Sequence, residues 1–279
     1  MTCSPVTRFA PSPTGRLHLG HVRSAHDGWR RARAGGGRFL LRIEDIDPGR
    51  CRPDHEAAIL DDLRWLGLHW DGPVWRQSGH MPEYRAALDR LAERELLFPC
   101  FCTRADVLAA VSAPHAAPDG STLYPGTCRR LDPAERRDRV SAGEPHALRL
   151  DMASALRIAG PLSRVEEGRG RVACHPGRFG DIVLARKDVP ASYHLCSTHD
   201  DALQDVTLVT RGIDLEPCAD LHRLLQHLFG WPEPGYAHHP LVLGPDGSRL
   251  AKRDGAVSVR ALRDMGLAAD EVLRRAAAD

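Results

Sequence analysis

The chain has 279 residues, of which 42% are hydrophobic and 27% charged, an ordinary composition for a globular protein with one large or two small domains. No window approaches the ~18 consecutive apolar residues that a membrane span needs, so we expect no membrane-spanning segment. Its 38 basic and 37 acidic residues give a formal net charge of +1, so binding to nucleic acid would need a local basic patch.

The N-terminus and the cysteine content both bear on the compartment of the protein. The first ten residues lack the basic start, apolar stretch and cleavage site of a signal peptide, so we expect the chain to stay in the cytoplasm. Disulfides are then not the default state of its eight cysteines. The chain has no Asn and only two lysines, Lys187 and Lys252. Where Arg replaces most lysines, a surviving lysine is a mild sign that a compact ammonium is needed.

The first elements along the chain predict a βαβ unit. We expect a strand over 6–10, a Pro-rich turn over 11–15, a helix over 19–34 and a strand over 38–43. This connection favours a right-handed crossover and a parallel sheet. The carboxyl ends of both strands then lie at the same edge, which is where open α/β sheets bind their ligands.

The remaining segments predict an α/β protein whose sheet is interrupted by an insertion. Two packing helices follow, one starting at Pro53 and one over about 84–96. The next part contains cysteines, an Ala- and Pro-rich loop, a charged stretch and a short strand over 147–150, and we interpret it as the insertion. Strand-like segments return at 181–185 and 205–210. They are followed by a helix over 219–229 and an apolar run over 241–243. We therefore divide the chain into residues 1–97, 98–176 and 177–279: the first half of the sheet domain, the insertion, and the second half with a short C-terminal helix.

Two histidines three residues apart begin the first helix. His18 and His21 fall on its first turn, where unpaired N–H groups and the helix dipole favour a phosphate. Imidazole N–H groups there can donate to a phosphoryl group as negative charge develops on it. Gly20 leaves room for a nucleobase or ribose against the backbone. An isolated pair of this kind is more often made of capping or surface residues.

The segments around this pair resemble a known family. Residues 8–15 with His18 to His21 are similar to the HIGH signature of class I aminoacyl-tRNA synthetases, in the form of the glutamyl and glutaminyl enzymes. Residues 40–47 resemble the glutamyl version, and the resemblance continues to Lys252 over nearly the whole chain. It implies a Rossmann-like class I aminoacyl-tRNA synthetase catalytic domain with ATP and Mg²⁺ as substrate. The family mechanism is electrostatic stabilisation of the phosphoryl transition state without a protein nucleophile.

The resemblance also implies which residues surround the amino acid. A dicarboxylic amino acid needs two cationic groups for its carboxylates and one anion for its ammonium. Arg8, Arg211 and Glu44 supply these charges, and which arginine binds which carboxylate is left open. The implied glutamate site consists of Arg8, Ala10, Ser12, Glu44, Tyr193 and Arg211.

Lys252 occupies a position that resembles the second lysine of the family's KMSKS loop, which meets the ATP phosphates as pyrophosphate leaves. The resemblance thus implies an ATP site of His18, Gly20, His21 and Lys252, with His18, His21 and Lys252 as the catalytic residues. Two positions depart from the family pattern, Arg249 for the first lysine and Ala251 for the serine. An Arg can still bind phosphate, so we expect activity to persist.

A possible metal site lies in the insertion. Cys100 and Cys102 are followed by Tyr124 and Cys128, and three thiols alone are as compatible with buried free cysteines as with a metal. The short relatives of glutamyl-tRNA synthetase, which the chain resembles, carry one structural zinc bound by three Cys and one Tyr at this spacing. His115 is the rival fourth ligand, because imidazole is commoner on zinc than phenolate.

The length suggests a subgroup within the family. Only 26 residues follow Arg253, so we expect no anticodon-binding domain. This resembles the glutamyl-queuosine tRNA(Asp) synthetases, which activate glutamate without tRNA and transfer it to queuosine in the anticodon loop of tRNA(Asp). We expect a monomer, with an arginine surface in the insertion as the candidate for phosphate contacts: Arg129, Arg130, Arg136, Arg137 and Arg139. A truncated ligase with another acceptor and a non-catalytic RNA-binding paralogue are the alternatives.

Overall fold

A computed structural model of the chain describes residues 4–110, 116–242 and 257–278. The rival zinc ligand His115 and the KMSKS-like positions Arg249, Ala251 and Lys252 lie outside the described residues. None of the described helices is both long and apolar enough to cross a lipid bilayer.

Two parallel strand groups lie side by side and form the main sheet. The first group has the order β1 (Val6–Phe9), β2 (Arg38–Ile43), β3 (Trp75–Arg76). The second has the order β7 (Gly170–Ala173), β6 (Ser163–Glu166), β10 (Gly235–His239), β9 (Leu208–Gly212), with β7 antiparallel to β6. The Thr207 N–H donates to the Val6 carbonyl at 3.0 Å, which joins β9 to β1 at their starts. The predicted parallel α/β sheet is thus confirmed.

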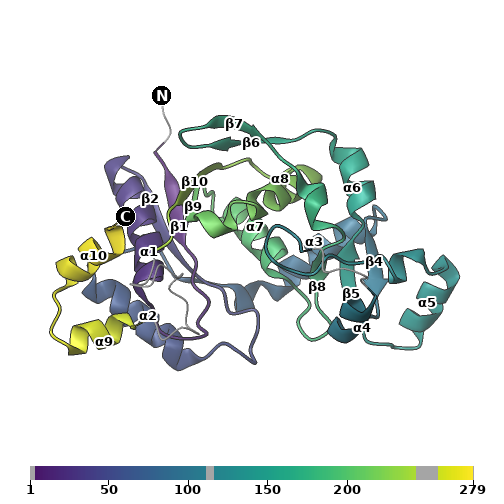
Figure 1. Cartoon of the computed structure of the whole chain (residues 1–279), viewed down its shortest axis with the longest axis horizontal. Helices are drawn as coiled ribbons and strands as arrows, with labels where there is room; N and C mark the ends of the chain where they lie inside the picture. Colours follow the sequence, from purple (N-terminus) through teal and green to yellow (C-terminus); the bar gives the residue numbers. More distant parts are fainter. Residues whose placement is uncertain (1–3, 111–115, 243–256, 279) are drawn as a thin grey trace.

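Helix α1 (Leu19–Ala34) connects β1 to β2 and packs against β1, β2 and β9. It starts after a turn with prolines at 11 and 13, which cannot continue a strand, and it ends at Gly35. The pair α9 (Val259–Asp264) and α10 (Ala269–Ala277) packs beside α1 at the left of Figure 1. Helix α2 (Pro53–Trp65) contributes Ile59 and Leu63 to the hydrophobic core that it shares with α1, β2, α9 and α10.

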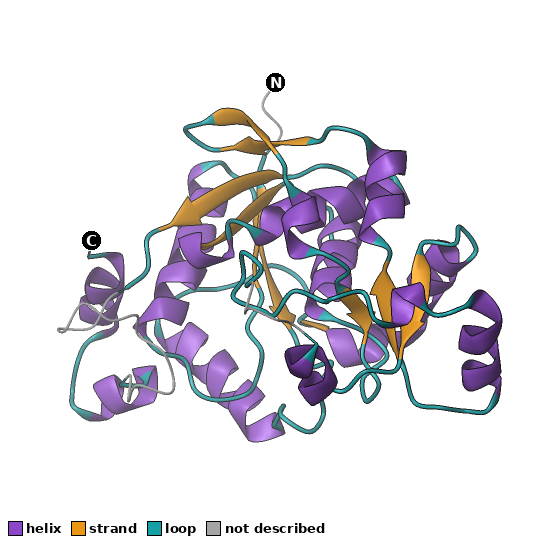
Figure 2. Ribbon diagram, turned by 45° about the vertical axis from the view of Figure 1, so that its right-hand side comes forward, coloured by secondary structure: helices purple, strands orange, loops and turns teal. Residues whose placement is uncertain are grey.

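The insertion has its own small antiparallel sheet, of the order β4 (Leu97–Cys100), β5 (Ala147–Leu150), β8 (Val183–Ala185). Helices α4 (Arg104–Ala109), α5 (Pro133–Ser141) and α6 (Met152–Ala159) belong to this side of the molecule. Between the two sheets lie α3 (Met81–Ala92), α7 (Tyr193–Leu203) and α8 (Cys218–Phe229), whose apolar faces share one core with β5 and β8. Figure 2 shows the two sheets with these helices between them.

Several elements have the predicted bounds, and others differ. The helix over 19–34 and the strands over 38–43 and 147–150 are observed as predicted. Sheet membership does not follow the predicted division at 98 and 176, because β6 and β7 pair with the main sheet and β8 pairs with the insertion. Strand β10 was not predicted; residues 241 and 242 of the predicted apolar run lie just after it and form no strand.

Candidate active site

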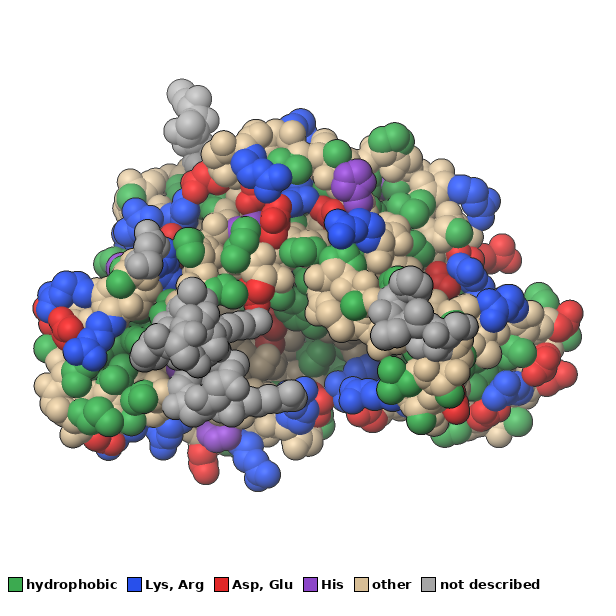
Figure 3. All heavy atoms as spheres, viewed as in Figure 1, with side chains coloured by type: hydrophobic (Ala, Val, Ile, Leu, Met, Phe, Trp, Pro, Cys, Tyr) green, Lys and Arg blue, Asp and Glu red, His purple; other side chains and the backbone are tan. Residues whose placement is uncertain are grey.

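A cavity of about 380 Å³ lies at the carboxyl ends of β1, β2 and β9. Figure 3 shows the surface hollowed near the middle of this face, beside the grey atoms of residues that are not described. Nine of the ten residues predicted for the glutamate and ATP sites line this cavity, and the tenth, Lys252, lies outside the described residues. The nine are Arg8, Ala10, Ser12, His18, Gly20, His21, Glu44, Tyr193 and Arg211.

The two histidines at the start of α1 cap the helix as well as line the cavity. The Gly20 N–H donates to His18 Nδ1 at 3.1 Å, and the His18 N–H donates to His21 Nδ1 at 3.2 Å. Because both Nδ1 atoms accept, the proton of each neutral ring is on Nε2. The cap therefore fixes the tautomers and makes each Nε2 a hydrogen-bond donor. The capping role and the predicted phosphate-binding role do not compete, because they use opposite nitrogens.

Gly20 leaves room for the His18 imidazole that caps the helix. A Cβ at this position would lie 3.0 Å from His18 Cε1 and 3.2 Å from its Nδ1, closer than ordinary van der Waals contact. A larger residue would therefore require the imidazole to shift by a few tenths of an ångström. The sequence predicted this glycine for a different reason, close approach of a nucleotide.

Arg8 is held in the cavity wall by a carboxylate. Its Nε and Nη2 donate to the two carboxylate oxygens of Asp201 at 2.9 and 3.3 Å, and its Nη1 donates to the Thr210 carbonyl. The fully buried Arg42 also donates to Asp201, at 2.8 Å. Burial alone would raise the pKa of Asp201, but the Arg8 and Arg42 guanidiniums hold it below its usual range. The positive charge of Arg8 is thus compensated before any ligand binds.

Glu44 lies one residue beyond β2, and its backbone N–H donates to the Pro11 carbonyl at 3.0 Å. Its side chain is 11% exposed and lies 3.7 Å from Arg42 Nη2. Burial raises the pKa of Glu44 to about 7, although Arg42 and Arg8 favour its charged form. Binding of a cation beside it would favour the carboxylate, as the predicted ammonium site requires.

Arg211, in β9, is buried with no carboxylate partner among the described residues. Its Nε lies 3.2 Å from His238 Nε2, and its Nη1 lies 3.3 Å from His222 Nδ1. Its Nη2 has no hydrogen-bond partner in the described part of the chain. A buried guanidinium without an anion is costly, so this arrangement favours binding of an anionic ligand in the cavity.

A second cavity, of about 650 Å³, adjoins the first and extends to the insertion. The two cavities share Ser12, Thr14, Glu44 and Tyr193 in their walls. Its far side carries Arg104, Arg149 and Tyr124 of the insertion. A large ligand could therefore reach the first cavity from the insertion side.

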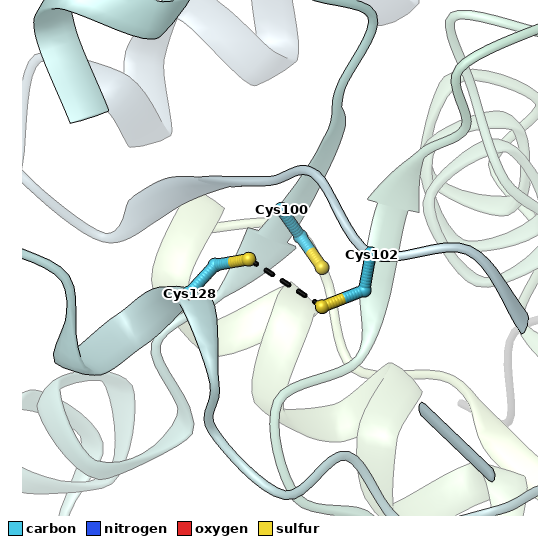
Figure 4. Close-up of side chains that lie close together, drawn as sticks. All are labelled: Cys100, Cys102 and Cys128. Atoms are coloured by element: carbon cyan, nitrogen blue, oxygen red, sulfur yellow. Dashed lines mark hydrogen bonds between the residues drawn. The ribbon is translucent and has the colours of Figure 1, made fainter. Parts of the chain in front are cut away.

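The predicted metal ligands come together in the insertion. The Sγ atoms of Cys100, Cys102 and Cys128 all lie within 4.8 Å of one another, and Figure 4 shows the three side chains pointing toward a common centre. The Tyr124 hydroxyl lies 3.9 Å from Cys102 Sγ and accepts a hydrogen bond from the Cys128 N–H at 2.7 Å. The edge of a tetrahedron with zinc–sulfur bonds of about 2.3 Å is about 3.8 Å. The Cys102–Cys128 distance of 3.5 Å is close to this value.

Sequence reasoning missed the residues that hold the two arginines. Asp201, His222 and His238 carry no motif of their own, and each acquires its contact only when α7, α8 and β10 pack against β1 and β9. No signal within the sequence assigns a partner to either arginine.

The cavity and the sheet around it define a class of protein. A family model described as "tRNA synthetases class I (E and Q), catalytic domain" matches residues 5–276. The chain therefore belongs to the family of class I tRNA synthetases for glutamate and glutamine, and it is a ligase. The predicted class I catalytic-domain fold is confirmed.

Within this family the chain is similar over nearly its whole length to proteins named Glutamyl-Q tRNA(Asp) synthetase. The relative from Rhodobacter capsulatus is 48% identical, over 96% of this chain and 98% of the relative. That from Symbiobacterium thermophilum is 44% identical, over 95% of this chain and 83% of the relative. The predicted resemblance to this group is confirmed.

The solved structure of a glutamate tRNA ligase from Elizabethkingia meningosepticum, in complex with its amino acid, matches with a TM-score of 0.76 at 30% identity. The match covers 90% of this chain and 52% of that protein. The chain thus spans about half the length of this ligase.

Proposed function

We propose that the protein activates glutamate with ATP in the absence of tRNA and transfers the glutamyl group to queuosine of tRNA(Asp). The observation that carries this proposal is that one cavity at the start of α1 is lined both by Glu44 and by Arg211, which has no carboxylate partner among the described residues. An anionic side chain meets Arg211, and the ammonium of the same ligand meets Glu44. Arg8, Ala10, Ser12 and Tyr193 complete the glutamate site. The names of the similar proteins support the acceptor.

ATP binds next to glutamate in this proposal, with its phosphates at the start of α1. His18 and His21 donate from Nε2 to the phosphoryl oxygens, and Gly20 lies under the nucleotide. The glutamate carboxylate attacks the α-phosphate, the bond to the β-phosphate breaks, and pyrophosphate leaves with Mg²⁺. Lys252 stabilises the departing pyrophosphate. The described residues on either side of its segment support this, because Val242 lines the cavity and Ser258 pairs with His18.

The acceptor enters through the second cavity. A hydroxyl of queuosine attacks the carbonyl of the glutamyl-adenylate, and AMP leaves. The shared lining of Ser12, Thr14, Glu44 and Tyr193 supports this route, because it places the second cavity directly beside the adenylate site on the insertion side.

The cysteine cluster holds one structural zinc in this proposal. Cys100, Cys102, Cys128 and Tyr124 supply four ligands, which leave no position for a reactive water. The zinc would connect β4 to the loop before α5 and would take no part in the chemistry.

Exchange of labelled pyrophosphate into ATP tests the activation step. We expect exchange with glutamate and Mg²⁺ alone and none with glutamine; absence of exchange would contradict the proposal. Lys252→Ala should lower the exchange rate much more than it raises the KM for glutamate, because the charge acts mainly as pyrophosphate leaves. Lys187→Ala is the matched control, since the Lys187 ammonium donates to the Phe101 carbonyl in the insertion.

Transfer of labelled glutamate tests the acceptor. We expect tRNA(Asp) with queuosine to accept glutamate and the unmodified transcript to accept none. Labelling of the 3′ end of tRNA(Glu) would instead identify a truncated ordinary synthetase.

A further inference from the structure

The two arginines of the cavity are held by groups of different charge. Arg8 makes two charged hydrogen bonds to Asp201. Arg211 contacts two histidines, with His238 Nε2 at 3.2 Å from its Nε and His222 Nδ1 at 3.3 Å from its Nη1. Among the described residues, no carboxylate forms an ion pair with Arg211. The same type of side chain is thus neutralised on one side of the cavity and left charged on the other.

The contacts fix the protonation of both histidines. A guanidinium only donates, so His222 Nδ1 and His238 Nε2 must accept and cannot carry a proton. His222 Nε2 then carries the proton and lies 3.3 Å from His194 Nδ1. His238 Nδ1 carries its proton and donates to Glu166 Oε1 at 2.6 Å. Each imidazole is therefore a single neutral tautomer.

The surroundings keep both rings neutral. Burial and the nearby Arg211 charge lower the pKa of His222 well below its usual value, and burial lowers the pKa of His238 to about 3. Glu166 forms no ion pair with Arg211 and contacts it only through the neutral His238 ring; its other oxygen accepts at 3.3 Å from Arg164, which also pairs with Glu216 and Asp220. Among the described residues, no negatively charged group contacts Arg211; besides the two histidines its guanidinium faces the Tyr236 ring, with its Cζ 5.6 Å from the ring centre.

We propose that His222 and His238 are positioning residues that make the cavity select a carboxylate over a carboxamide. They orient Arg211 with uncharged acceptors, leave its positive charge for the ligand, and leave Nη2 without an acceptor among the residues that the structure describes. This inference rests on the proposed function, in which the ligand is glutamate and the competitor is glutamine. Had a carboxylate held Arg211, the pair would be neutral and the cavity would gain little from the charge of the ligand.

The pair His222→Asn and His222→Asp tests this inference with a change of one charge. Asn and Asp both place an oxygen near the position of Nδ1, and both lose the contact to His194. We expect His222→Asn to keep the ratio of kcat/KM for glutamate to that for glutamine within about threefold in pyrophosphate exchange. We expect His222→Asp to lower this ratio by about tenfold or more, through loss of glutamate activation, because the new carboxylate neutralises Arg211. Equal ratios for the two variants would overturn the inference.

A measurement on the unaltered protein covers the case in which His222→Asp does not fold. Long-range ¹H–¹⁵N spectra of histidine-labelled protein report tautomers directly, and the signals of His222 are assigned by their absence in His222→Asn. We expect neutral His222 with the proton on Nε2 and neutral His238 with the proton on Nδ1 between pH 6 and 8. A doubly protonated ring, or the opposite tautomer, would overturn the inference. Absence of glutamate-dependent exchange in the wild-type protein would instead contradict the proposed function.

Discussion

The burial of the Glu44 carboxyl predicts that glutamate binding depends on pH. Its pKa is raised to about 7 by burial, so a large share of the protein carries the neutral acid at neutral pH. The proposed ammonium site needs the carboxylate. Below about pH 7 we therefore expect the KM for glutamate to rise about tenfold per pH unit, and above it to level off. Measurement of KM in pyrophosphate exchange from pH 5.5 to 8.5 checks this expectation.

Two variants serve as controls for the role of Glu44. Glu44→Gln has no titrating group at this position, so we expect a high KM that stays flat below pH 7. Asp45→Asn changes the neighbouring acid, which accepts from the Ser78 N–H and hydroxyl, and we expect it to keep the wild-type pH profile. A flat wild-type KM across pH 6 to 8 would show that Glu44 does not meet the ammonium.

The position of a site residue was predictable from the sequence where that residue lies at the end of a predicted strand or helix. Glu44 follows β2, and His18 precedes α1, so the predicted βαβ unit alone brought them to one edge of the sheet. The acceptors of Arg211 were not predictable in this way. His222 and His238 lie on α8 and β10, and their relation to β9 depends on packing between elements that no local pattern describes.

At the scale of elements, helix α7 shows where periodicity fails. Seven consecutive residues of this helix, 195–201, are buried, and five of them are polar, so no apolar stripe identifies the helix. These polar side chains are satisfied by tertiary partners; for example, Asp200 accepts from Tyr84 and Gln77. Helix α8 has the opposite character and was predicted, since its apolar residues follow helical spacing and Gly230 ends it with a φ of +69°.

The insertion gives a prediction about metal content. We expect elemental analysis of protein purified without chelator to find one zinc per chain, and Cys102→Ser and Tyr124→Phe to lower this content. The reason is that each variant removes one of four ligands that lie around a common centre. Cys174→Ser, outside the cluster, should keep the full content.

Two results would contradict the metal assignment. Protein without zinc would show that the three thiols are free cysteines. Full zinc in Tyr124→Phe together with its loss in His115→Ala would identify His115 as the fourth ligand.

At the scale of the whole molecule, the arginines of the insertion fall into two groups: those that pair with carboxylates of the chain and those that are available to bind phosphate. Arg129 pairs with Asp181 at 3.2 Å, and Arg139 pairs with Glu144 at 2.6 Å. The side chains of Arg136 and Arg137, on α5, make no hydrogen bond or ion pair with the described residues. Of the predicted arginine surface, these two are best placed to contact phosphates of a tRNA.

The double variant Arg136→Glu, Arg137→Glu tests this assignment. We expect transfer of glutamate to tRNA to fall about tenfold or more and its dependence on salt to weaken, because phosphate contacts and the counterions that they release are lost. Pyrophosphate exchange, which needs no tRNA, should stay unchanged. The double variant Arg157→Glu, Arg171→Glu is a charge-matched control that should leave transfer near the wild-type rate, because these arginines lie on α6 and β7, outside α5, and donate to Ser154 and Ser163. Equal losses in both variants would indicate a general effect of charge.

The cap at the start of α1 restricts how this protein can change over evolutionary time. A residue that replaces His18 must both accept from the Gly20 N–H and donate toward the cavity. Ser, Thr and Asp cap well, and their loss to Ala costs about 1 kcal/mol, but an ionised Asp has no donor, and Ser or Thr must use one oxygen for both contacts, whereas the imidazole uses two separate nitrogens. Asn does both, yet this chain contains no Asn at any position. The readiest substitute for this histidine is thus a residue type that this chain uses nowhere.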